Sequence, residues 1–490
     1  MIKKEFNVRL IFKIFGTILL VETFALLTAA LVAGIYREME LTLFLKIAGL
    51  TFIFGLAFLL SGIKASPMIG RREGSLVVTL TWVVFSAFGM LPFWLSGSIP
   101  SITDAYFETI SGFTTTGASI LNNIEELPYS ILFWRSLTHW IGGLGIIVLS
   151  LALLPVFGVS GSQLFAAESS GPTKDKIHPK ISETAKSLFL IYGILTFAQT
   201  ILLKLGGMNW FDALCHSFGT VATGGFSTKQ DSIGYWDSAY IQYVIAFFML
   251  LSGVNFSLYY FGFKNKFGKI FRNEELKYYL LTLFIFTVVV ALSLFDFKAG
   301  FNLDRLEEVW REAFFNVTAV MTTTGFATAD YMNWKTFTWV LLLIAMIIGA
   351  SAGSTSGAIK MVRIVIVMKY CYFEFKKLIH PQAVIPIRYN GHFVNEDVIT
   401  KVLAFVLLYL ITIAFGILIL TFSGMPLLES IGGMITCLGG VGPGLGQVGP
   451  AGNFAQIPEF SKWFLSFVML LGRLELFTVL VLFTPAFWKK

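Results

Sequence analysis

Four segments of this chain repeat one pattern, in which an acidic residue precedes a glycine by thirteen positions. The acidic residues are Asp104, Asp212, Glu312 and Glu429, and the matching glycines are Gly117, Gly225, Gly325 and Gly442. Each segment is predicted to form a short amphipathic half-helix followed by a glycine turn, and each lies between two long apolar stretches. Four such units in one chain predict a ring around an axis, as in a cation pore whose wall is made of backbone carbonyls.

Composition places these segments in a membrane. Hydrophobic residues make up 56% of the chain and charged residues 13%, whereas about 25% charged residues is typical of soluble domains. Apolar stretches of about 20 residues are long enough to cross a bilayer as helices. We therefore predict an all-α polytopic membrane protein with ten full spans and four re-entrant pore loops. The spans are an N-terminal pair at 10–36 and 43–63, and four further pairs at 76–97 and 127–157, 187–203 and 238–263, 278–295 and 336–359, and 402–423 and 460–487.

The order of spans and glycine turns predicts two N-terminal helices followed by four helix–pore-helix–helix repeats. The expected boundaries are 1–70 for the N-terminal pair and 71–160, 161–270, 271–395 and 396–490 for the repeats.

Loop charge predicts the orientation of the chain. The connections expected on one side carry 24 Lys and Arg, whereas the loops that contain the four segments carry six Lys and Arg and 15 acidic residues. Because positively charged loops stay in the cytoplasm, we expect both termini inside and the four turns entering from outside. Acidic residues at the outer vestibule would raise the local cation concentration. The alternative is that they only solubilise the loops or complement the positive N-terminal ends of the half-helices.

The glycine turns predict a selectivity filter. A half-helix entering the membrane points its partly negative C-terminal end at the bilayer centre, and the irregular chain after it must line a wet cavity. Carbonyls there replace the water shell of a cation, and glycine permits the dihedral angles that turn them inward. The predicted filter residues are Thr115, Thr116, Gly117, Thr223, Gly224, Gly225, Thr323, Thr324, Gly325, Gly440, Val441 and Gly442.

Two departures from symmetry affect this filter. The second loop offers two glycines: the common offset selects Gly225, and a frame one residue earlier would use Ala222 and Thr223. The fourth loop has no hydroxyl before its glycine. We therefore expect an asymmetric filter with loose selectivity that admits Rb⁺ and some Na⁺.

The four loops resemble those of a known family. The stretches 114–118, 222–226, 322–326 and 439–444 are similar to the filter loops of the Trk/Ktr/HKT superfamily of potassium transporters. The additional N-terminal helix pair and the glycine-rich fourth loop favour the TrkH branch over the shorter KtrB branch. The resemblance implies potassium uptake across the bacterial inner (plasma) membrane, with K⁺ as the transported ion and no organic cofactor. It also implies a homodimer in which each subunit has its own pore, a cytoplasmic TrkA-type ring of nucleotide-binding regulatory subunits, contacts with membrane lipid and no nucleic-acid partner.

Two features below the predicted filter suggest gating. Seven of the nine residues from Gly349 to Gly357 are Gly, Ser or Thr, a composition that predicts a break in the second helix of the third repeat. The resemblance implies an intramembrane gate there, and the alternative is a small-residue face for helix packing. The gate residues would be Gly349, Ser351, Gly353, Ser354, Thr355, Ser356 and Gly357.

The second feature is Arg473 in the last span, where the resemblance implies an electrostatic barrier. The alternative is an ion pair with Glu475, although residues two apart on a helix do not face each other.

Other ionisable residues and other functional classes point less strongly to a function. Arg135 and His139 lie one helical turn apart and are expected to anchor the interface or brace a pore helix, and His216 is expected to be a structural hydrogen-bond partner. No spacing of histidines or paired carboxylates on a span suggests a catalytic centre, so we do not expect an enzyme. A proton- or sodium-coupled carrier for another solute remains the alternative function, although such carriers more often show two related halves than four quarters. Whether K⁺ moves as through a channel or by coupling to H⁺ or Na⁺ stays open.

Overall fold

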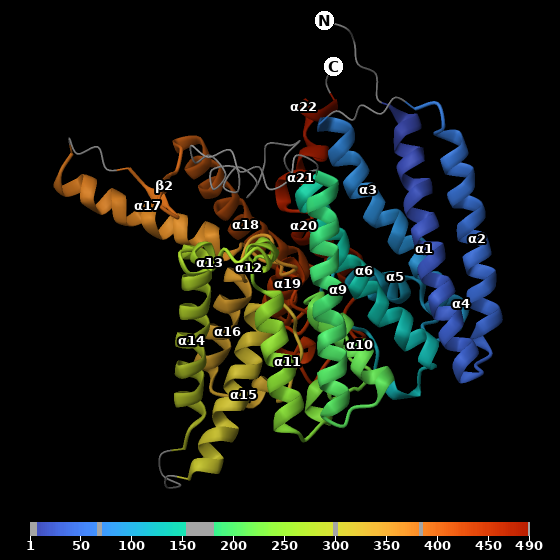
Figure 1. The fold of residues 1–490 in the computed structure, drawn as a ribbon, viewed down its shortest axis with the longest axis horizontal. Helices are drawn as coiled ribbons and strands as arrows, with labels where there is room; N and C mark the ends of the chain where they lie inside the picture. The colour runs from blue at the N-terminus through green and yellow to red at the C-terminus, as the bar shows by residue number, and fades with distance from the viewer. Residues whose placement is uncertain (1–6, 66–70, 153–180, 297–301, 382–385, 489–490) are drawn as a thin grey trace, which may run out of the picture.

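The computed structural model describes residues 7–65, 71–152, 181–296, 302–381 and 386–488, and its regular structure is almost wholly α-helical (Figure 1). The chain begins with two long helices, α1 (Val8–Tyr36) and α2 (Glu40–Ser61). Four groups of helices follow, each with a first long helix, a second helix that has 12 or 13 residues in three of the groups and 19 in the third, and a further helix after a connecting loop. The fold class predicted from the sequence is thereby confirmed.

The helices of the first two groups have the following bounds. The first group contains α3 (Arg71–Gly89), α4 (Leu91–Leu95), the short helix α5 (Ile102–Phe113) and α6 (Tyr129–Ala152). The second contains α9 (Ile181–Leu205), the short helix α10 (Trp210–Val221), α11 (Ala239–Ser252), α12 (Phe256–Phe263) and α13 (Phe267–Phe271).

The other two groups are built in the same order. The third contains α14 (Glu274–Leu294), α15 (Leu303–Met321), α16 (Thr336–Ile348) and α17 (Met361–Ile379), followed by a two-stranded antiparallel sheet of β1 (Arg388–Tyr389) and β2 (His392–Phe393). The fourth contains α18 (Glu396–Phe422), the short helix α19 (Leu427–Gly439), α20 (Glu459–Arg473), α21 (Leu476–Leu480) and α22 (Pro485–Trp488).

Six helical segments of the described chain are long and apolar enough to cross a membrane: α1, α2, α3 with α4, α9, α14 and α18. The number is eight if each bent pair is one span, because α11 and α12 meet at 93° and α20 and α21 at 116°. The predicted spans 238–263 and 460–487 are therefore broken helices. The two remaining predicted spans correspond to α6 and to the 13-residue α16, and residues 153–157 lie outside the described residues.

The two N-terminal helices pack closely because small residues line their contact. An added Cβ on Gly16 would meet the backbone of Gly55 and Leu59, and one on Gly62 would meet the backbone of Arg9 and Lys13. Close backbone approach of this kind is typical of helix pairs in membranes, where packing replaces the hydrophobic driving force. The α1–α2 pair lies at one edge of the molecule, beside α3 (Figure 1).

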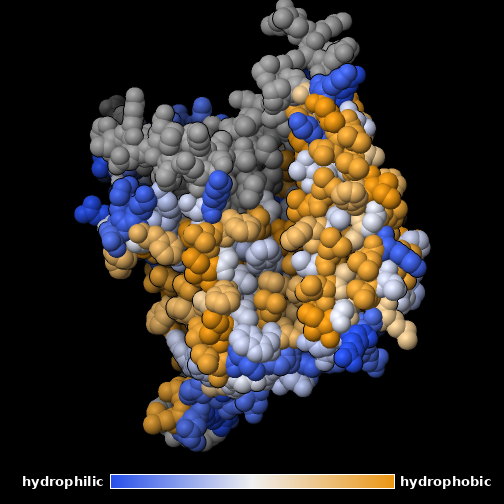
Figure 2. Space-filling view, turned by 45° about the vertical axis from the view of Figure 1, so that its right-hand side comes forward, coloured by the Kyte–Doolittle hydropathy of each residue, from blue (hydrophilic) through white to orange (hydrophobic). Residues whose placement is uncertain are grey.

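The outer surface of the helices is apolar. Phe24 of α1, Phe197 of α9 and Phe415 of α18 are well exposed, and Figure 2 shows hydrophobic residues covering the sides of the molecule, with hydrophilic residues gathered toward its upper and lower ends. This distribution is the one expected for helices surrounded by lipid.

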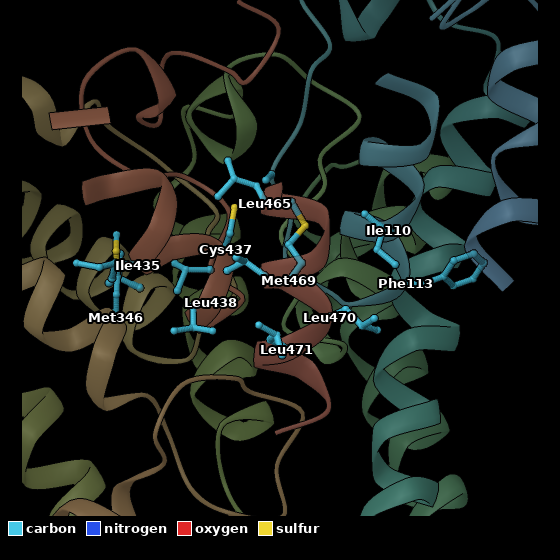
Figure 3. Close-up of a cluster of buried hydrophobic side chains, with 14 of the residues drawn as sticks. Ile110, Phe113, Met346, Ile435, Cys437, Leu438, Leu465, Met469, Leu470 and Leu471 are labelled. Carbon is cyan, nitrogen blue, oxygen red and sulfur yellow. The ribbon is translucent and has the colours of Figure 1, made fainter. Parts of the chain in front are cut away.

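The interior around the short helices is packed with aliphatic side chains. Cys437 and Leu438 of α19 lie beside Leu465, Met469 and Leu471 of α20 (Figure 3). Cys437 is fully buried among them, as expected for a small apolar filler. This core fixes the direction of α19 and hence the position of the loop that follows it.

Candidate ion pathway

The four helices that precede the glycine loops, α5, α10, α15 and α19, begin with hydrogen-bonded caps or acidic first turns. The Ser101 side chain accepts a bond from the backbone N–H of Asp104 at 3.3 Å, and the Asn209 side chain accepts one from Asp212 at 2.7 Å. In the third group the prediction is wrong about the helix start: α15 has 19 residues, so Glu312 lies well inside the helix. The four equivalent acids therefore do not all sit at helix N-termini.

Each of these acids has a structural hydrogen-bond partner. Asp104 accepts a bond from the Lys462 ammonium at 2.6 Å, and Asp212 accepts one from the Thr228 hydroxyl at 2.6 Å. The Glu312 and Glu429 carboxylates accept bonds from the Trp334 indole and the Gln447 backbone, respectively.

The helices α5, α10, α15 and α19 all end in the same backbone motif. The residue before each glycine donates its N–H to the carbonyl five positions earlier, the bond that defines a Schellman motif. These bonds are Thr116 to Ser111 at 2.9 Å, Gly224 to Gly219 at 2.7 Å, Thr324 to Ala319 at 2.8 Å and Val441 to Thr436 at 2.9 Å.

Two residues of each loop have left-handed backbone conformations. The glycines at the thirteen-residue offset have φ of 82°, 84°, 77° and 102°, and the residues two positions earlier, Thr115, Thr223, Thr323 and Gly440, have φ of 53°, 53°, 58° and 70°. A β-branched residue in this region is an outlier that costs about 1–3 kcal/mol. Three such threonines at equivalent places are held there by the fold, whereas the fourth loop has a glycine and avoids the strain.

The four loops form a closed ring. An added Cβ on each glycine would collide with the backbone of the next loop: Gly117 with the carbonyl of Gly224, Gly225 with that of Thr324, Gly325 with that of Val441, and Gly442 with that of Thr116. The ring thus places the carbonyls before the four glycines side by side. Gly117, Gly225, Gly325 and Gly442 also line one and the same pocket. This geometry places Gly225, preceded by Thr223 and Gly224, in the frame of the other loops.

The additional glycine of the second loop, Gly224, is explained by a steric contact. An added Cβ on Gly224 would meet the ring of His139 at 2.5–2.7 Å. The His139 ring stacks on Phe226 with centroids 4.0 Å apart, and its Nδ1 is 2.7 Å from the carbonyl of Gly112. His139 therefore occupies the space that a side chain at position 224 would need, and it braces a pore helix as the sequence suggested.

The segment between α16 and α17 is not helical, so it is not a face for helix packing. The Thr355 hydroxyl donates to the carbonyl of Val221 at 3.0 Å, and the Gly357 N–H donates to the Thr323 hydroxyl at 2.8 Å. A Cβ on Gly357 would collide with the carbonyl of Gly439. The segment therefore contacts the inner ends of the second, third and fourth loops.

The first half of this segment is anchored to the break between α11 and α12. Ser351 donates its N–H to the carbonyl of Gly253 at 3.0 Å, and Phe256 donates to the carbonyl of Gly353 at 3.0 Å. Within the segment, the Ser354 hydroxyl donates to the carbonyl of Ser351 at 2.6 Å. Gly349 begins the segment with φ of 72°, which ends α16.

Sequence reasoning missed two residues that hold the segment in place. The Glu275 carboxylate accepts the N–H groups of Ala352 at 2.6 Å and Val362 at 3.1 Å, so one side chain binds both ends. The Lys360 ammonium donates to the carbonyl of Ser356. Glu275 is buried although it lies in the first turn of a long apolar helix, and an acid in that setting is the signal that could have identified it.

Arg473 contacts the same segment. Its guanidinium donates to the carbonyl of Thr355 at 2.7 Å and to that of Gly142 at 3.3 Å. The pair with Glu475 considered from the sequence is wrong: the Glu475 carboxylate pairs with Arg363 at 2.9 Å. α20 ends at Arg473 and the chain then turns by 116°, which separates the two side chains.

The fold and the ring define a class: a polytopic membrane protein in which four repeats surround one candidate cation pathway. Comparison with known proteins agrees with this class. The model of the TrkH family, described as a cation transport protein, matches residues 47–490. The chain belongs to the TrkH family.

Curated relatives and a solved structure are similar to nearly the whole chain. It is 39% identical over 485 residues to the Trk system potassium uptake protein TrkH of Escherichia coli (strain K12), covering 98% of this chain and 99% of the relative. It is 37% identical over 487 residues to the protein of the same name from Halomonas elongata, covering 99% and 100%. The crystal structure of the potassium transporter TrkH from Vibrio parahaemolyticus matches with a TM-score of 0.90 and 35% identity, covering 99% of this chain and all of that one.

Proposed function

We propose that this protein takes up K⁺ across the bacterial inner membrane through the ring formed by its four glycine loops. The observation that carries the proposal is the closed ring of contacts between the four loops, in which each ring glycine lies against a backbone carbonyl of the next loop. Carbonyls converging on one axis can replace the hydration shell of a cation. The names of the relatives, potassium uptake proteins, support K⁺ as the ion.

The twelve filter residues predicted from the sequence are proposed to supply this site. Within it, the carbonyls of Thr116, Gly224, Thr324 and Val441 are the central candidates, since they precede the four ring glycines. These four residues do not all have the same side chain, but coordination of a cation by carbonyls needs only the backbone. The same left-handed conformations recur in all four loops, which supports a common role.

The segment from Gly349 to Gly357 is proposed to be the gate, and Arg473 the barrier beneath the filter. The contacts of the segment with the inner ends of three loops support an occluding position. The bond from Arg473 to the carbonyl of Thr355 supports a joint role, because a positive charge at that point both repels cations and holds the segment.

The assembly and orientation belong to the proposal as well. We place both termini in the cytoplasm, divide the chain at 70, 160, 270 and 395, and expect a homodimer with a cytoplasmic TrkA-type regulatory ring. The described starts of α1 and α22 lie at the same end of the molecule (Figure 1), which supports a common side for the termini. The phrase "Trk system" in the names of the relatives supports partner subunits in general.

Uptake of labelled Rb⁺ into proteoliposomes tests the proposed function. We expect uptake in vesicles containing the purified protein, inhibition by K⁺ at concentrations near those of Rb⁺, and weaker inhibition by Na⁺. Uptake equal to that of protein-free vesicles, or equal inhibition by K⁺ and Na⁺, would refute it. Reversal potentials under imposed K⁺, H⁺ and Na⁺ gradients distinguish a channel from a coupled carrier.

A further inference from the structure

A buried ion pair lies behind the first filter loop. The Nε atom of Arg135 on α6 is 2.7 Å from Oε1 of Glu108 on α5, and the two side chains are 2% and 0% exposed. Glu108 also accepts the Ile120 N–H at 2.9 Å and the Ser119 hydroxyl at 3.0 Å. The carboxylate therefore connects the pore helix to the chain that leaves the filter.

The same arginine holds the second filter loop. Its Nη1 donates to the carbonyl of Ser227 at 2.8 Å, and its guanidinium carbon lies 3.6 Å from the centroid of the Phe226 ring. Its Nη2 donates to the Ser119 hydroxyl of the first loop at 3.1 Å. A planar guanidinium can make these bonds at once because its donors point in fixed, divergent directions.

At the equivalent positions, all of them among the described residues, the other three repeats have no arginine. Arg135 is the seventh residue of α6, and the seventh residues of α11, α16 and α20 are Ile245, Leu342 and Leu465, all fully buried. Nine positions before the ring glycine, where the first repeat has Glu108, the others have His216, Asn316 and Gly433. His216 and Asn316 each bond a hydroxyl of their own loop, Ser227 at 2.9 Å and Thr328 at 3.0 Å.

From these contacts we infer that Arg135 is a specificity-determining positioning residue: with Glu108, it fixes the spacing of the first and second filter loops and so sets discrimination between K⁺ and Na⁺. The inference rests on the proposed potassium uptake. Arg135 acts through the loops and does not touch the ion. A ring that keeps its spacing cannot contract around the smaller Na⁺, whereas a ring with a loosened junction can.

The loops are braced unequally. The junction of the first and second loops has a charged bridge, while the fourth loop has a glycine at the position of Glu108. Because a lone buried charge is strongly destabilising, the pair must be removed together to test its role in selectivity separately from its role in folding.

The test is the double variant Glu108→Asn with Arg135→Leu, which installs the residues of the third repeat at both positions. We measure Rb⁺ uptake into proteoliposomes and the Na⁺ concentration that halves it. We expect folded protein with Rb⁺ uptake retained and half-inhibition at about tenfold lower Na⁺, since loss of one charge-assisted hydrogen bond to a loop carbonyl corresponds to about a factor of ten.

The matched control is Arg311→Leu. Arg311 of α15 also links two repeats, through a bond of 3.0 Å to Gln242 of α11, but this bond reaches no filter loop. Its Na⁺ inhibition should equal that of the wild type. If the double variant does not fold, Arg135→Lys decides the matter: a single ammonium keeps the charge but cannot bridge both loops, so Na⁺ inhibition should again strengthen.

The outcomes are distinct. Wild-type selectivity in a folded double variant, or in Arg135→Lys when that variant is the readable one, overturns the inference. Equal loss of selectivity in Arg311→Leu also overturns it, because the effect would then follow from any lost contact between repeats. Failure of the wild-type protein to take up Rb⁺ at all would instead refute the proposed function.

Discussion

Substitution of Arg473 by alanine is the most direct probe of the region beneath the filter. The change removes a buried positive charge and the bond of 2.7 Å that holds the carbonyl of Thr355. Both effects favour an open path. We therefore expect Rb⁺ uptake, measured without a regulatory partner, to increase.

The expected size of the increase follows from two contributions. Two unit charges about 4 Å apart in a medium of effective dielectric near 20 repel by roughly 4 kcal/mol. A hydrogen bond from a charged donor contributes about 1.5–3 kcal/mol to the stability of the closed segment. Since about 1.4 kcal/mol is a factor of ten, even a third of the repulsion predicts about a tenfold rise in the initial uptake rate.

The assay compares initial Rb⁺ uptake in proteoliposomes at equal protein content, with yield in detergent measured alongside. Arg473→Lys keeps a charge and should retain most of the barrier. Glu475→Gln is informative because it breaks the pair with Arg363 and leaves Arg473 untouched. A well-folded Arg473→Ala protein with wild-type uptake would remove this residue from the permeation pathway. If Arg473→Ala lowers the yield of folded protein and the double variant Arg473→Ala with Glu475→Gln recovers it, the observed pairing of Glu475 with Arg363 would be contradicted.

Three further predictions concern the filter and the gate. Gly225→Ala should abolish selective Rb⁺ uptake because the added Cβ collides with the neighbouring loop, whereas Gly97→Ala, which has a similar φ of 77° but open space around it, should keep it; similar uptake in both variants would contradict the ring. Thr323→Val removes the hydroxyl that accepts the gate N–H at 2.8 Å, so basal uptake should rise about fivefold for a bond worth about 1 kcal/mol, and an unchanged rate would argue against occlusion by this segment. Gly224→Thr should abolish uptake by clashing with His139, and adding His139→Met, the residue type at the equivalent place of the other repeats, should restore part of it; no restoration would show that the clash is not the cause.

The sequence by itself determined the class of the molecule and the location of its special residues. Long apolar stretches require helices in a bilayer, and an acid and a glycine at a constant offset identify four equivalent turns in a single chain. The run from Gly349 to Gly357 predicted a broken helix for the same local reason, since glycine and hydroxyl residues weaken the helix and supply alternative partners for its backbone. These features depend on residues close together in sequence, and a pattern records them directly.

Contacts between distant segments were decided only by the tertiary structure. The frame of the second loop depends on the contacts of Gly225 with the third loop and of Gly224 with His139. Arg473 donates to the carbonyls of Thr355 and Gly142, both more than a hundred residues away in sequence, because the bend after α20 turns the neighbouring Glu475 elsewhere. The bridge from Arg135 to two filter loops is likewise invisible in a linear pattern, since pairing in a low-dielectric interior depends on which helices the fold places side by side.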